Sequence, residues 1–116
     1  MYEISADVER NRLYLTLMDI GPGEGKLFNN DIRVEVEKLK PGFSAVSDIR
    51  NFVVNAPEEG AWADQIIQYL VKMGMKRAVR ITGTSVSSQK GMEEAGYVAY
   101  MAENLEAAEK MLDQME

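Results

Sequence analysis

The sequence predicts a single α/β domain over residues 1–116, in which a β-hairpin precedes alternating helices and strands. Apolar residues alternate with polar ones near the N-terminus, and later apolar runs with helical spacing are separated by short apolar segments. A chain of 116 residues with 46% hydrophobic and 28% charged residues also suits one domain with its own core. We therefore expect a mostly parallel, five-stranded sheet with about four helices.

An antiparallel hairpin is predicted at the N-terminus. Between Tyr2 and Val8 the apolar residues occupy alternate positions, which is typical of a half-buried strand. After a short polar connection the alternation resumes from Leu13 to Leu17, so the second strand is expected to end near Ile20.

A helix is predicted over residues 25–40. Its apolar residues Phe28, Ile32 and Val36 recur at helical spacing, and a Pro-Gly pair ends the run. Because Ile32, Val34 and Val36 also alternate, a strand stays open for this part of the chain.

Three short apolar segments predict the remaining strands. They cover residues 43–49, 78–81 and 97–101, and turn residues adjoin them, as expected for buried parallel strands. Arg80 lies inside the second segment, so its side chain must reach solvent, a counter-ion or an interface.

A second helix is expected over residues 55–73. Asn55 can cap its first turn, and Trp62 lies on an apolar face with Ile66 and Leu70. Gly74 stands where a left-handed residue would end the helix.

Two more helices are expected in the C-terminal third. Ser87 or Ser88 could cap a short helix that ends before Gly96. The final helix has an apolar face formed by Leu105, Ala108, Met111 (or Leu112) and Met115.

Composition narrows the possible functions. The 13 basic and 19 acidic residues give a net charge of −6, which disfavours nucleic-acid binding. Cysteine and histidine are absent, so disulfides, thiolate nucleophiles, imidazole bases and the usual zinc sites are not expected. We expect no cofactor and no enzymatic activity.

Without an apolar run of about 20 residues or a signal-like N-terminus, we expect no transmembrane segment and a cytoplasmic location.

A ligand site is expected at the carboxyl ends of the parallel strands. Three loops gather there, covering residues 21–25, 50–57 and 83–88. In the last of these loops, Ser85, Ser87 and Ser88 could hold or accept a phosphoryl group, although capping is the stronger interpretation.

Methionines and carboxylates offer two further candidate sites. The chain has eight methionines, and Met92 and Met101 could line an apolar ligand site or partner surface, with core packing as the alternative. Asp19 and Asp48, near the ends of two strands, could bind Mg²⁺ or share a proton.

Three stretches resemble the STAS superfamily, in particular its SpoIIAA-like branch, and also the CRAL-TRIO lipid-carrier fold. They are the hairpin YEISADVERNRLYLTL, the segment FSAVSDIRNF followed by a helix and KRAVRITG, and the tail YVAYMAENLEAAEKML. The resemblance implies a non-catalytic sheet protein that binds a regulatory partner or holds apolar ligands.

One departure from the family pattern concerns phosphorylation. In the anti-sigma-antagonist branch, a serine that a kinase phosphorylates follows an acidic strand end by two residues. Asp48 matches the acidic residue, but Arg50 occupies the serine position. The resemblance therefore does not carry the phosphorylation switch over to this position.

These observations leave three hypotheses. The leading one is a STAS-like module that binds either a protein partner or another copy of itself, as in a homodimer. The alternative is a carrier or sensor of a small hydrophobic, lipid-like ligand, for which an empty apolar space between the second and the final helix would be evidence. The third is an acid–base or metal-dependent enzyme using Asp19 and Asp48.

Overall fold

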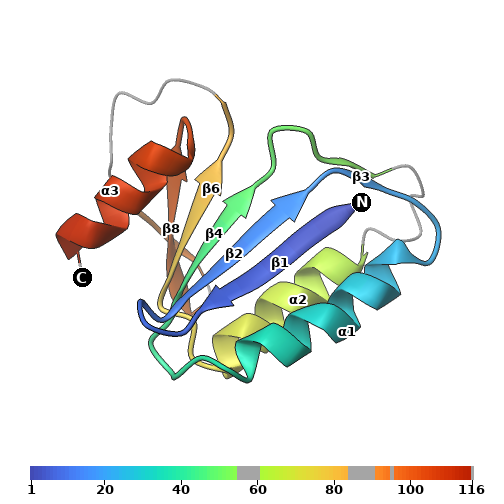
Figure 1. The fold of residues 1–116 in the computed structure, drawn as a ribbon, viewed down its shortest axis with the longest axis horizontal. Helices are drawn as coiled ribbons and strands as arrows, with labels where there is room; N and C mark the ends of the chain where they lie inside the picture. Colours follow the sequence, from blue (N-terminus) through green and yellow to red (C-terminus); the bar gives the residue numbers. More distant parts are fainter. Residues whose placement is uncertain (55–60, 84–90, 95, 116) are drawn as a thin grey trace.

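The structure, a computed structural model, describes residues 1–54, 61–83, 91–94 and 96–115, and has helices on both faces of a central sheet (Figure 1). The predicted α/β class is confirmed. The strands are β1 (Tyr2–Asp7), β2 (Arg12–Leu17), β3 (Asp19–Ile20), β4 (Ser44–Asp48), β5 (Val53–Val54), β6 (Arg77–Ile81), β7 (Met92–Glu94) and β8 (Tyr97–Ala102). The helices are α1 (Glu24–Val36), α2 (Ala61–Lys72) and α3 (Leu105–Met115).

Within the described ranges, the main sheet has six strands in the order β1-β2-β4-β6-β8-β7. The four central strands β2, β4, β6 and β8 run parallel to their neighbours, whereas β1 and β7 pair antiparallel at the edges. The predicted hairpin is confirmed, with Tyr2 opposite Leu17 and Asp7 opposite Arg12.

The first predicted helix is also confirmed, with an earlier end. Phe28, Ile32 and Val36 are buried at intervals of four residues, whereas Val34 is 58% exposed. Burial therefore follows the helical period, and the strand alternative for this segment is wrong.

The short helix expected before Gly96 is wrong over its described residues. Met92–Glu94 form β7, which pairs antiparallel with β8. A Cβ on Gly91 would lie 2.5 Å from a methyl group of Val98, so glycine lets the chain pass close beside β8. The part of the chain that is described thus has six strands in the main sheet and three helices, in place of five strands and four helices.

A small parallel pair, β3 with β5, was also missed. Asp19 lies opposite Val53 in this pair. Two-residue strands carry too little periodicity to be recognised in the sequence.

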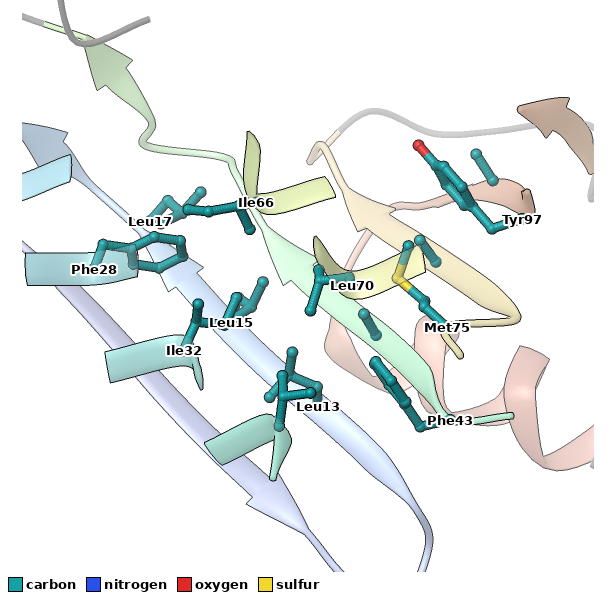
Figure 2. Close-up of a cluster of buried hydrophobic side chains, with 14 residues drawn as sticks. Leu13, Leu15, Leu17, Phe28, Ile32, Phe43, Ile66, Leu70, Met75 and Tyr97 are labelled. Carbon is teal, nitrogen blue, oxygen red and sulfur yellow. The ribbon is translucent and has the colours of Figure 1, made fainter. Parts of the chain in front are cut away.

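Two apolar clusters fill the two faces of the sheet. Between the sheet and helices α1 and α2, Leu13, Leu15 and Leu17 of β2 face Phe28 and Ile32 of α1 (Figure 2). On the opposite face, α3 packs on β4, β6 and β8 through Ala108, Met111 and Leu112. The final helix is as predicted except at Leu105, which is exposed.

An ion-pair network also joins α3 to the sheet. The Arg12 side chain on β2 is only 3% exposed, and it donates to Glu109 at 3.2 Å and to Asp113 at 2.8 Å. Arg10 donates to Glu109 at 2.7 Å, and the Tyr14 hydroxyl donates to the same carboxylate. Two arginines of the first hairpin thus bind carboxylates of the acidic C-terminal helix.

In the described part of the chain, no helix has the length and hydropathy needed to cross a bilayer.

Candidate functional site

A partly enclosed apolar cavity lies between the sheet and helices α1 and α2. Its volume is about 210 Å³. Figure 2 shows Leu15 and Leu17 of β2 facing Phe28 of α1 and Ile66 of α2, all of which line the cavity. It does not lie between the second and final helices, where an empty apolar space would have been evidence for a ligand carrier, because α2 and α3 cover opposite faces of the sheet.

Strand register explains why this space exists. In neighbouring parallel strands, paired residues project to the same face of the sheet. Ala45 of β4 is paired with Ala78 of β6, and both line the cavity. Two adjacent alanines leave a shallow floor beneath α2, where larger side chains would fill the space.

Three polar side chains interrupt the apolar lining. Ser47 and Arg80 are paired across β4 and β6, and Tyr97 lies at the start of β8. The Arg80 guanidinium donates a hydrogen bond from Nη2 to the Tyr97 hydroxyl at 2.9 Å. Within residues that the structure describes, no carboxylate forms an ion pair with Arg80.

Exposure along the lining locates the mouth of the cavity. Leu15, Ala45 and Ala78 are buried, whereas Ser47 and Arg80 are half-buried. Ser47 and Arg80 each lie two residues closer to the carboxyl end of their strand than Ala45 and Ala78 do. The cavity therefore opens toward that edge of the sheet, where parallel α/β sheets usually bind ligands.

Met92 and Met101 lie on the same face of the sheet as this opening. Met101 is paired with Arg80, and Met92 is paired with Ala99, which in turn is paired with Ala78. Their side chains are 63% and 46% exposed, so neither is core packing. The structure thus places Met101 beside Arg80, whereas Met92 lies on the next strand beyond, opposite Ala99.

Asp48 and Arg50 form a pair of their own at the end of β4. Arg50 donates from Nε to Oδ1 at 3.0 Å and from Nη2 to Oδ2 at 2.7 Å. These hydrogen bonds lower the pKa of the Asp48 carboxyl below its usual value. Asp48 follows Ser47 in an extended strand, so it belongs to the opposite face and not to the cavity.

The proposed pairing of Asp19 with Asp48 gains no support from the geometry. Both carboxylate oxygens of Asp48 are occupied by Arg50. Among the described residues there is no cluster of three or more acidic, histidine or cysteine side chains suited to a metal ion.

Several predicted site residues lie outside the described part of the chain. These are Asn55, Ser85, Ser87 and Ser88. Trp62 lies in α2, but its side chain is not described.

Ser47, Tyr97 and the alanine pair were missed by sequence reasoning. No signal for the alanine pair was present in the predicted strands, since Ala45 is the third residue of segment 43–49 and Ala78 the first of segment 78–81, so their pairing follows from the observed register. Tyr97 gave no signal either, because its contact with Arg80 depends on the parallel pairing of β6 with β8.

Comparisons with protein-family models, with curated proteins and with solved structures found no significant match to this chain. The cavity and its three polar side chains are therefore the basis for a functional proposal.

Proposed function

We propose that this protein binds a small, largely apolar molecule in the cavity between the sheet and helices α1 and α2. It acts as a non-catalytic carrier or sensor in the cytoplasm, the location that the sequence predicts. The observation that carries the proposal is the apolar space of about 210 Å³ with a half-buried polar mouth. The resemblance of three sequence stretches to the CRAL-TRIO lipid-carrier fold agrees with the proposal.

The volume sets the size of the ligand. An apolar protein cavity of about 150 Å³ is large enough to bind benzene. Pockets for drug-sized ligands are larger, at roughly 300–1,000 Å³. The cavity of about 210 Å³ therefore suits a molecule somewhat larger than benzene, such as a substituted benzene ring or a short branched chain.

Methyl NMR with toluene as the probe tests this proposal. We expect the methyl signals of Leu15, Ile66 and Met75 to shift on titration, because these side chains line the cavity. Those of Met111 and Leu112 should stay in place, because they pack on the opposite face. Unchanged cavity signals, or equal shifts on both faces, would contradict the proposal.

A matched pair of variants locates the response. Ala45→Leu places added methyl groups in the cavity, so it should abolish the toluene shifts. Ala107→Leu makes the same change at a half-buried position of α3 on the opposite face, and it should leave the response intact. Toluene binding that survives Ala45→Leu would place the site elsewhere.

A second proposal is a STAS-like interaction module that binds another copy of itself. Two large apolar side chains, Met92 and Met101, are exposed on one face of the sheet. Exposed methionines form adaptable apolar contacts at interfaces. Sedimentation velocity tests this proposal: the protein should form dimers as its concentration rises, and Met101→Lys should keep it monomeric. A monomer at every concentration would rule it out.

A further inference from the structure

We propose that the ligand of the cavity is a small apolar carboxylic acid, whose carboxylate binds Arg80 at the mouth. This inference rests on the proposed function and names the chemical class of its ligand.

Among the described residues that line the cavity, Arg80 is the one with a charged side chain. Every other lining residue that the structure describes is apolar or an uncharged hydroxyl residue. Bringing a guanidinium beside apolar surface carries a desolvation cost unless an opposite charge and hydrogen bonds compensate it. Among the described residues, Arg80 has one hydrogen-bond partner, the Tyr97 hydroxyl, which is neutral and does not compensate the charge.

The hydrogen-bonding capacity of Arg80 leaves room for a ligand. A guanidinium has five N–H donors in a planar fork that matches the two oxygens of a carboxylate. The hydrogen bond to Tyr97 uses Nη2. It also holds the guanidinium beside the Tyr97 hydroxyl and so orients the remaining donors.

The position of Arg80 matches an amphipathic ligand. The half-buried Ser47 and Arg80 lie at the mouth, and the buried Leu15, Ala45 and Ala78 lie deeper. A molecule with one charged end would place its carboxylate against Arg80 and its apolar part between the sheet and α2. One guanidinium balances one carboxylate charge, whereas a phosphate monoester near neutral pH carries close to two.

Calorimetry with 3-phenylpropanoate and its neutral analogue 3-phenylpropanamide tests the inference. The two probes have nearly the same shape and differ in charge. A hydrogen bond to a charged group is worth roughly 10- to 100-fold in affinity, so the wild-type protein should prefer the acid by about that factor. Equal affinities would overturn the inference while leaving the proposed function standing. If neither probe binds, the inference fails, and the toluene titration decides separately whether the proposed function stands.

Variants assign the preference to Arg80. Arg80→Met keeps the apolar stem and should bind the amide within about threefold of wild type, with the preference for the acid lost. Lys76→Met removes one positive charge from an exposed position just before β6 and should keep the preference. A preference that survives Arg80→Met would overturn the inference.

Tyr97→Phe is a second variant for the case that Arg80→Met does not fold. It removes the hydroxyl that holds Arg80 and should weaken binding of the acid more than binding of the amide. Equal weakening of the two probes would count against the positioning of Arg80 by Tyr97.

Discussion

Arg80 brings a positive charge to an apolar cavity, and its hydrogen bond to Tyr97 fixes where that charge lies. The sequence indicated that Arg80 needs a special environment, because it interrupts an apolar strand. It did not indicate the partner, because Tyr97 belongs to a different strand 17 residues further along the chain. Only the pairing of β6 with β8 brings the two side chains together.

The Asp48–Arg50 pair gives a residue-scale prediction on pH dependence. Because Arg50 lowers the pKa of Asp48, the pair stabilises the fold above the ordinary aspartate pKa of about 3.9. This contribution is lost as the pH falls through the lowered pKa of the folded state. Arg50→Gln should therefore raise the pKa of Asp48 toward its usual value, which a carboxyl ¹³C NMR titration measures.

Lys26→Gln is the control for that titration. Lys26 is an exposed cation of α1 and forms no hydrogen bond with Asp48, so its replacement should leave the Asp48 titration unchanged. An Asp48 pKa that does not move in Arg50→Gln would show that the pair does not form in solution.

At the scale of elements, periodicity predicted the long segments well and the short ones poorly. α1 and the hairpin have repeated apolar positions, and both were predicted. The strand Met92–Glu94 has three residues, all exposed, so no pattern of burial marks it in the sequence. It is a strand because β8 offers an unpaired edge, which is a property of the assembled sheet.

The end of α2 gives an element-scale prediction. Gly74 has φ of 106°, and an added Cβ would lie 2.7 Å from the Cα of Pro41. Gly42 has φ of 92° but no atom within 4 Å of an added Cβ. Gly42→Ala should cost about 1–2 kcal/mol for the left-handed backbone. Gly74→Ala should cost more, because it adds a clash with backbone.

Urea unfolding of the two variants measures this difference. Equal midpoints for Gly42→Ala and Gly74→Ala would show that contact with Pro41 is relieved at no cost. The prediction depends on backbone atoms, which cannot move aside as a flexible side chain can.

The attachment of α3 gives a second element-scale prediction. Glu109 accepts hydrogen bonds from Arg10, Arg12 and Tyr14, and its side chain is 22% exposed. Asp113 is 60% exposed, and within the described residues its ion pair is with Arg12. Glu109→Ala should therefore cost about 1–3 kcal/mol, and Asp113→Ala less than about 1 kcal/mol. Thermal or urea unfolding checks the order, and a larger loss in Asp113→Ala would contradict it.

At the scale of the whole molecule, the sheet separates two differently packed faces. α3 and the sheet close one face with a filled cluster around Val79 and Leu112 and with the Arg12 network. α1 and α2 cover the other face (Figure 1). The cavity lies between these helices and the sheet. An empty apolar space between α2 and α3, which would have been evidence for a carrier, does not form, because the two helices cover opposite faces of the sheet. Helical periodicity does not say which face of a sheet a helix covers.

A crystal structure of the protein with 3-phenylpropanoate would test the central claim most directly. The phenyl ring should lie between Leu15 and Ile66, with the carboxylate within about 3 Å of the Arg80 guanidinium. A ligand bound against α3, or a cavity that stays empty at a saturating ligand concentration, would contradict the account.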